Sequence, residues 1–266
     1  MSQTQPAPVC ITHIGGPTAL IEIGSLRILT DPTFDPAGTR YVYAPNFEAL
    51  KQTDPAIALS GLGAIDAILL SHDQHDDNLD RSGRAYLPHA GRVLTTVAGA
   101  HRLGGNAHGV ATWETVTLAG KEGLRVQVTA TPSRHGPPEL EEAMGEVSGW
   151  ILEWEGQRHG ALYVSGDTVY FEKLQEIPRR YHVGTALLHL GAAHFDARGP
   201  FHLTFMAAEG AQFARELGVS TVIPIHYEGW AHLVEKRAEI EHAFVSAGLE
   251  QQLRFLPLGQ AVVIDG

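Results

Sequence analysis

Two apolar segments of this chain end in the same way, on a histidine. Residues 67–72 (Ala-Ile-Leu-Leu-Ser-His) and residues 222–226 (Val-Ile-Pro-Ile-His) are each typical of a buried strand that stops at an imidazole. A strand end holds its side chain at the edge of a sheet, so several such ends can direct their ligands to one centre. The pattern therefore predicts a sheet-based fold with a metal site assembled from residues far apart in the sequence.

Further candidate ligands lie in and between these two segments. The stretch His-Asp-Gln-His-Asp-Asp-Asn-Leu-Asp occupies residues 72–80, and His135 and Asp167 follow in residues 131–136 and 162–168. Imidazole and carboxylate groups suit Zn²⁺, Mn²⁺ or Fe²⁺, and no thiolate accompanies them. These residue types indicate a site for one or two divalent ions, with zinc as the first choice and manganese or iron as alternatives.

The composition limits the class of protein. The 266 residues suffice for one large domain, and 44% hydrophobic with 18% charged residues is typical of a soluble globule. A net charge of −11 lacks the basic footprint of a nucleic-acid-binding protein. The only cysteine, Cys10, cannot form an internal disulfide, which favours the cytoplasm. No apolar run approaches the ~20 residues of a membrane span.

The order of patterns predicts one domain over residues 9–266, preceded by a loose tail at residues 1–8. We expect strands at residues 9–14, 18–23, 26–30, 65–70, 115–118, 124–130, 147–154, 160–164, 185–190 and 221–225. Helices are expected at residues 79–86, 97–103, 171–177, 204–217 (with Thr204 as N-cap) and 233–248. Strand-rich and then mixed segments favour two sheets flanked by helices.

Residues 36–63 are rich in Pro, Tyr and Gly and predict a long irregular loop. The apolar part around Tyr41, Tyr43 and Phe47 is interpreted as either a substrate lid or a contact in a homo-oligomer.

At this point the chain resembles the metallo-β-lactamase-fold hydrolases. Thr-His-Ile-Gly-Gly-Pro-Thr at residues 12–18 and Leu-Thr-Asp-Pro at residues 29–32 are similar to the N-terminal signature of one branch. That branch contains ascorbate-phosphate lactonases and N-acyl-phosphatidylethanolamine phospholipases. His135, Asp167 and His226 occur in the order of the superfamily's later ligands. The resemblance covers about residues 9–264 and implies a four-layer α/β/β/α sandwich with its active site where the two sheets meet.

The residues after the first strand-end histidine depart from the superfamily motif, His-x-His-x-Asp-His. Counted from His72, the second and last histidines of the motif are replaced. Counted back from Asn78-Leu79-Asp80, the motif keeps His75 and Asp77, with one extra residue after His72. We favour this second register because it retains three ligands. In either register the last histidine is missing.

The resemblance implies roles for the remaining candidates. The metal ligands would be His72, His75, Asp77, His135, Asp167 and His226, with Asp167 as the bridge between two ions. Either Asp76 or Asp77 is expected to orient the attacking water or accept its proton. His202 is expected near the substrate, or else packs at a helix entry. His13 is either a core histidine or a residue near the metals on the substrate side. Trp230 and His232 are candidates for the pocket wall, the alternative for Trp230 being packing under the last helix.

These observations predict a cytoplasmic metal-dependent hydrolase that acts on a small ester, lactone or phosphodiester substrate. An RNA-processing-type nuclease of the same fold is one alternative, against which the acidic charge argues. A degenerate, non-enzymatic metal-binding protein is the other, because the motif after His72 is altered.

Overall fold

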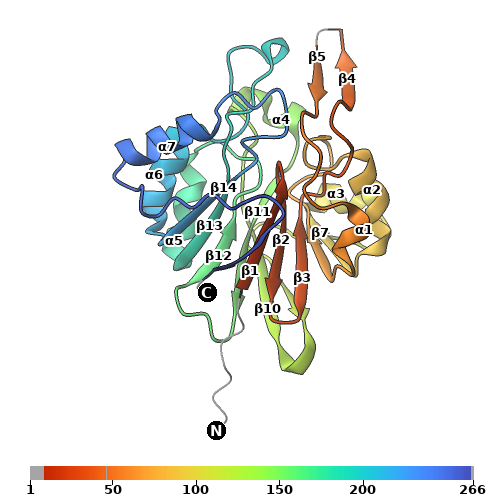
Figure 1. Cartoon of the computed structure of the whole chain (residues 1–266), viewed down its shortest axis with the longest axis vertical. Coiled ribbons are helices and arrows are strands. Elements are labelled where there is room, and N and C mark those ends of the chain that lie inside the picture. The colour runs from red at the N-terminus through yellow and green to blue at the C-terminus, as the bar shows by residue number, and fades with distance from the viewer. Residues whose placement is uncertain (1–8, 46, 265–266) are drawn as a thin grey trace.

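The computed structural model describes residues 9–45 and 47–264 and places two β-sheets face to face (Figure 1). The first sheet has the strand order β15-β1-β2-β3-β6-β7-β8 and the second β14-β13-β12-β11-β10-β9. The strands of the first are β1 (Val9–Gly15), β2 (Thr18–Ile23), β3 (Leu26–Thr30), β6 (Ala67–Leu69), β7 (Arg92–Thr95), β8 (Ala107–Gly109) and β15 (Ala261–Ile264). Those of the second are β9 (Thr115–Ala119), β10 (Arg125–Pro132), β11 (Ser148–Trp154), β12 (Ala161–Val164), β13 (Val183–His189) and β14 (Thr221–Ile225).

Helices cover the outer face of each sheet. Figure 1 shows α1 (Leu59–Leu62), α2 (Arg81–Tyr86) and α3 (Val97–Leu103) beside the first sheet, and α5 (Glu176–Arg180), α6 (Ala207–Leu217) and α7 (Arg237–Ser246) beside the second. A short helix, α4 (Glu141–Met144), lies apart from both sets. Apolar clusters join each set of helices to its own sheet, and a third cluster fills the space between the sheets. The four-layer α/β/β/α prediction is confirmed.

Strand β13 buries side chains on both of its faces. Leu187 packs between the two sheets, whereas Leu188 packs against the helices on the outer face. Because both faces are buried, the strand is apolar almost throughout rather than alternating. His189 is the last residue of this strand and continues on the side of Leu187. A polar side chain is thereby carried into the interior of the protein.

The strand directions explain why the candidate ligands meet. Strand β13 runs parallel to β12 and to β14, and β6 runs parallel to β3 and β7. The carboxyl ends of parallel strands lie at the same edge of their sheet, and His72, Asp167 and His226 all follow such ends. Ligand-bearing loops of both sheets are thus placed together.

The segment at residues 36–63 differs from the predicted irregular loop. It contains the hairpin of β4 (Arg40–Ala44) and β5 (Phe47–Leu50), which projects beyond the large sheets in Figure 1, and then α1. The hairpin is held by tertiary packing, because Tyr41 and Ala49 are buried in one cluster with Trp230. Local sequence does not reveal this packing.

Other boundaries also differ. Thr204 does not cap α6, which begins at Ala207; the Thr204 hydroxyl instead accepts a hydrogen bond from the Ala193 amide at 2.9 Å. Asp80 caps α2 by accepting from the Gly83 amide, so this helix begins two residues later than predicted. Strands β7, β8 and β15 were not predicted. The predicted tail at residues 1–8 lies outside the described residues.

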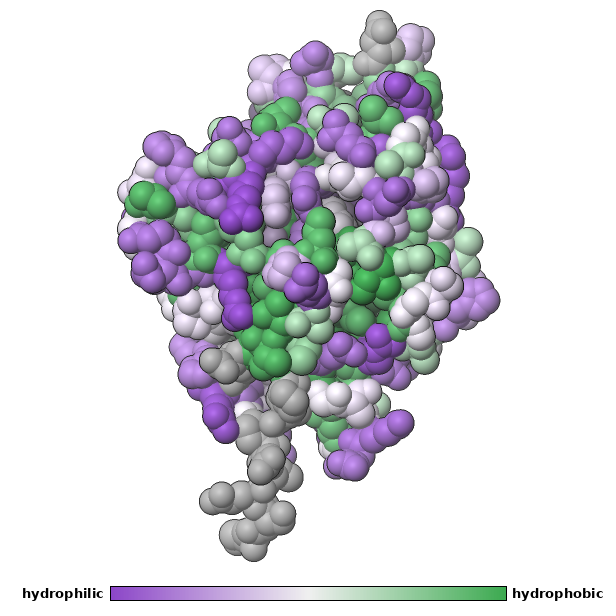
Figure 2. All heavy atoms as spheres, viewed as in Figure 1, coloured by the Kyte–Doolittle hydropathy of each residue, from purple (hydrophilic) through white to green (hydrophobic). Residues whose placement is uncertain are grey.

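The surface is mixed in character. Figure 2 shows mostly hydrophilic residues, with hydrophobic ones gathered near the middle of this face. Among the residues that the structure describes, no helix has both the length and the apolar character needed to cross a bilayer.

Candidate metal centre

Three histidines from two distant loops form the first cluster: His72 and His75 follow β6, and His135 follows β10. The Nδ1 atom of His75 lies 2.8 Å from Nε2 of His72 and 3.0 Å from Nε2 of His135. His72 and His135 are buried and His75 is partly exposed. With metal–nitrogen bonds of about 2.0–2.1 Å, tetrahedral geometry separates ligand nitrogens by roughly 3.3 Å. The three nitrogens are therefore close to the spacing that one ion requires.

Neighbouring groups orient two of these rings. Nδ1 of His135 donates to the carbonyl oxygen of Leu203 at 2.7 Å, which holds the ring with Nε2 towards His75. Nδ1 of His72 lies 2.9 Å from the Ser71 hydroxyl. Burial, together with His75 and His135, holds the pKa of His72 well below its usual range, so this ring is neutral. The Nε2 atoms of His72 and His135 thus both face Nδ1 of His75.

Asp77, Asp167 and His226 form the second cluster, and all three are buried. Nε2 of His226 lies 3.5 Å from Oδ2 of each carboxylate. Oδ2 of Asp77 also lies 2.8 Å from Nε2 of His232, whose side chain is 4% exposed. His232 therefore orients one carboxylate of this cluster from outside it.

Asp167 joins the two clusters. Its Oδ2 atom lies 3.6 Å from Nε2 of His135 in the first cluster and 3.5 Å from Nε2 of His226 in the second. One carboxylate oxygen therefore faces both groups of ligands. This is the position that a carboxylate shared by two ions requires.

The second cluster is strongly charged. Burial opposes ionisation of Asp77 and Asp167, but the adjacent imidazoles, chiefly His232 for Asp77 and His226 for Asp167, hold both pKa values well below their usual range. Burial lowers the pKa of His226, but Asp167 and Asp77 outweigh it and raise that pKa to about 10. Without a bound metal ion, the folded protein therefore keeps two buried carboxylates ionised beside a protonated imidazole.

A divalent ion fits these residues. Both oxygens of Asp167 and both ring nitrogens of His226 are buried and have no hydrogen-bond partner among the described residues. Buried polar atoms in native proteins are nearly always satisfied, so such a group of unsatisfied atoms calls for an ion or water. The donors of both clusters are imidazole and carboxylate, which suit zinc, manganese or iron.

The backbone at the site is unusual in two places. His226 has φ +52° and Asp31 has φ +30°, in or near a region that residues other than glycine rarely adopt. The His226 amide donates to the carbonyl of Gly16 at 2.8 Å, which holds this conformation. Such backbone conformations persist only where surrounding contacts enforce them, and they concentrate at functional sites.

The other sequence candidates lie around the clusters rather than in them. Asp76 is partly exposed and accepts a hydrogen bond from the Tyr43 hydroxyl at 3.0 Å. His13 is buried and donates from Nε2 to the Gly16 carbonyl at 3.0 Å. His202 turns towards α6, with Nε2 3.2 Å from Oε2 of Glu209, and this contact raises its pKa. Trp230 is 1% exposed and packs under Lys51 and Tyr41, so its ring does not line an open pocket wall.

Sequence reasoning missed two buried residues at the site, His189 and Asp31. His189 lies between Asp31 and Asp167, 3.7 Å from an oxygen of each. Burial raises the pKa of Asp31 to about 8 and lowers that of His189 to about 4. The signal for His189 was present, because it too ends an apolar strand.

The β4–β5 hairpin reaches the exposed side of the centre. Besides the contact of Tyr43 with Asp76, the ring of Phe47 meets Phe195 edge-on at 5.1 Å. Phe195 in turn stacks on His232 at 4.4 Å. Aromatic side chains therefore run from the hairpin to the second cluster.

Comparison with known proteins agrees with this architecture. A UPF0173 metal-dependent hydrolase of Korarchaeum cryptofilum is 26% identical over 256 residues, which cover 95% of this chain and 98% of the relative. An uncharacterized protein of Mycobacterium tuberculosis is 28% identical over 92% of this chain and 68% of its own length.

Solved structures share the fold. An isothiocyanate hydrolase from Delia radicum gut bacteria superposes with a TM-score of 0.78 at 19% identity, over 96% of this chain and 99% of the other. A possible metal-dependent hydrolase from Veillonella parvula gives a TM-score of 0.79 at 17% identity, over 97% and 100%. The sequence profile of the β-lactamase superfamily domain matches residues 26–227. The chain therefore belongs to the β-lactamase superfamily, as its motifs predicted.

Proposed function

We propose that this protein is a metal-dependent hydrolase that cleaves a small ester, lactone or phosphodiester. The observation that carries the proposal is the position of Asp167, whose Oδ2 atom lies 3.6 Å from His135 and 3.5 Å from His226. The membership of the superfamily and the name of the Korarchaeum relative support the same reaction class.

Each cluster would hold one ion, zinc first, with manganese or iron as alternatives. His72, His75 and His135 would bind the first, and Asp77, Asp167 and His226 the second. Two such ions would supply Lewis acidity and would lower the pKa of water, so that hydroxide is available near neutral pH. His232 would hold Asp77 in place through their 2.8 Å contact.

Asp76 is proposed to act as the general base that accepts the proton of the attacking water. It follows the first cluster in sequence, is partly exposed, and is not a member of either cluster. Burial, with a contribution from Asp77, raises its pKa. A carboxylate with a raised pKa is a stronger base than an ordinary one and suits general base catalysis.

The substrate is proposed to be a small molecule. The net charge of −11 argues against a polyanion such as RNA. Tyr43, Phe47 and Phe195 are proposed to form one wall beside the centre, which favours a substrate with an apolar part.

The direct test is metal analysis of protein purified without chelator, followed by hydrolysis of lactones, aryl esters, phosphodiesters and an aryl isothiocyanate. We expect stoichiometric transition metal in the wild type. We expect His72→Ala and His226→Ala to lose activity by more than ~100-fold, since replacing even outer partners of metal ligands costs ~10–100-fold.

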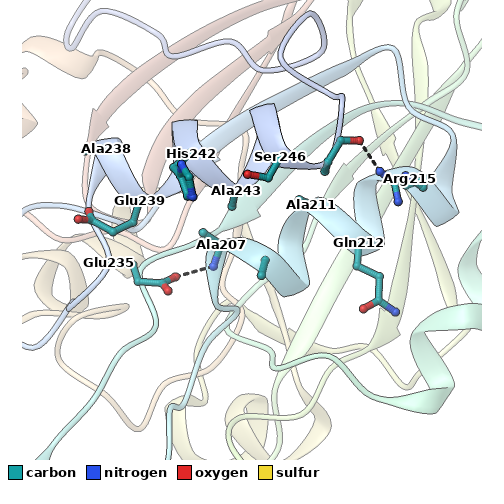
Figure 3. Close-up of a pocket in the computed structure, with 12 residues that line it drawn as sticks. Ala207, Ala211, Gln212, Arg215, Glu235, Ala238, Glu239, His242, Ala243 and Ser246 are labelled. Atoms are coloured by element: carbon teal, nitrogen blue, oxygen red, sulfur yellow. Dashed lines mark hydrogen bonds between the residues drawn. The ribbon is translucent and has the colours of Figure 1, made fainter.

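The matched control is His242→Ala. His242 is exposed in a groove between α6 and α7 that contains no residue of either cluster (Figure 3). This variant should keep wild-type activity and metal content. Absence of metal from the wild type, or full activity in both cluster variants, would refute the proposal. Bound metal without turnover across the panel would favour a non-enzymatic metal-binding protein.

Tyr43→Phe tests the role of Asp76. The Tyr43 hydroxyl donates to Oδ2 of Asp76 at 3.0 Å and favours the ionised carboxylate. Without it the pKa of Asp76 rises, so the acid limb of the kcat/KM profile should move to higher pH. Loss of such a hydrogen bond predicts an activity about 3- to 10-fold lower on that limb.

The control for this change is Tyr86→Phe, because the Tyr86 hydroxyl donates to the exposed carbonyl of Gly63 at 3.3 Å and neither residue belongs to a cluster. An unchanged pH profile in Tyr43→Phe would remove Asp76 from the proposed mechanism.

A further inference from the structure

We infer that His189 is a positioning residue for Asp167, the carboxylate shared by the two clusters. It holds Asp167 by Oδ1, the oxygen that does not face His135 and His226. The inference rests on the proposed function, since it concerns the same centre. It assigns a role to a residue that has no counterpart among the ligands implied by the sequence motifs.

The geometry places His189 on the outer side of Asp167. Nδ1 of His189 lies 3.7 Å from Oδ1 of Asp167, whereas Oδ2 of that carboxylate faces His135 and His226. On its other edge, Nε2 of His189 lies 3.7 Å from Oδ2 of Asp31. A single imidazole thus stands between two carboxylates. Both contacts are slightly longer than a hydrogen bond.

The surroundings of His189 call for such a role. The side chain is 0% exposed, and both its ring nitrogens lack a hydrogen-bond partner among the described residues, as does Oδ1 of Asp167. An unsatisfied buried polar group is destabilising, so an imidazole would be an unfavourable way merely to fill this space. Leu187, on the same side of β13, shows that the strand accepts an apolar residue there.

His189 also connects the two halves of the centre. The other oxygen of Asp31 accepts a hydrogen bond from the Ser71 amide at 2.7 Å, directly before His72. The His189 amide donates to the Ser165 hydroxyl at 2.9 Å, two residues before Asp167. The contacts therefore run from the loop of the first cluster through Asp31 and His189 to the shared carboxylate.

A direct ligand role fits less well. The ligand atoms within each cluster lie within 4.8 Å of one another, and His189 completes neither group. Its nearest carboxylate oxygen on Asp167 is the one turned away from the other ligands. Outer partners of this kind orient ligands and raise their basicity, and their loss typically weakens metal binding by about 10–100-fold.

The test measures zinc binding by competition with a chromogenic chelator, together with the zinc content at saturation. We expect His189→Ala to bind zinc about 10- to 100-fold more weakly while still reaching the wild-type number of equivalents. His189→Gln should recover part of the loss, because its amide N–H reaches towards Oδ1 of Asp167.

Leu187→Ala is the matched control, since it opens space on the same side of the same strand at a residue that belongs to neither cluster. It should lower the melting temperature and leave zinc affinity unchanged. Should His189→Ala fail to fold, the comparison of His189→Gln with the wild type decides: it should bind more weakly.

Three outcomes would overturn the inference. Wild-type affinity in His189→Ala and His189→Gln would mean that the ring only fills space. Loss of a whole zinc equivalent at saturation would make His189 a ligand. Equal weakening in His189→Ala, His189→Gln and Leu187→Ala would trace the effect to packing. In each of these the wild type still binds zinc, whereas a wild type without zinc would refute the proposed function itself.

Discussion

Replacing Asp167 by asparagine is expected to reduce kcat/KM by more than ~100-fold and to remove at least one bound metal equivalent. Asparagine keeps the size of the side chain but not its negative charge. The oxygen that lies between His135 and His226 would then no longer attract two cations. Steady-state kinetics on the best substrate of the panel, with metal analysis of the same sample, measures both effects.

Asp66→Asn is the control for this prediction. Asp66 is an exposed carboxylate that accepts a hydrogen bond from the Arg27 amide at 2.8 Å, away from both clusters. The same chemical change there should leave activity and metal content as in the wild type. If Asp167→Asn retained a tenth of the wild-type kcat/KM with full metal content, Asp167 would not be the shared ligand.

The candidate ligands could be predicted because the ends of buried strands can be recognised in the sequence. An apolar run that stops on His72 or His226 marks the edge of a sheet, and the structure brings both to one centre with Asp167. The structure also places His75 beside His72, as the favoured register requires. The Gln74 side chain instead accepts a hydrogen bond from the Asp73 amide.

What escaped sequence reasoning depends on tertiary contacts. Strand β13 was expected, but His189 became notable only when Asp31 and Asp167, each far away in sequence, were found on its two sides. The β4–β5 hairpin is short and interrupted by proline, and its packing on Trp230 involves a residue about 180 positions further along. Neither arrangement follows from local propensity.

Removing the metal from the wild type is expected to lower its melting temperature substantially without unfolding it at room temperature. An ion present at ~1,000 times its dissociation constant stabilises the folded state by about 4 kcal/mol. For a domain of this size each kcal/mol shifts the melting temperature by roughly 2–4 °C, so a loss of about 8–16 °C is expected per site. The fold should persist, because Asp77, Asp167 and His226 neutralise one another in part without an ion. Differential scanning calorimetry with and without chelator measures the change.

The stabilisation by metal should also increase with pH, because His226 must lose a proton when it binds the ion. Its pKa is raised to about 10, so the metal-free folded protein carries a proton there below that pH. Binding a cation to Nε2 must release this proton, and each proton released makes the apparent affinity rise about tenfold per pH unit. The difference in melting temperature between metal-bound and metal-free protein should therefore be larger at pH 8 than at pH 6. His226→Ala should lose the increment of the second site and the pH dependence that the His226 proton gives it. A difference of the same size at both pH values would mean that metal does not displace the proton of His226, and the second cluster would then need another role.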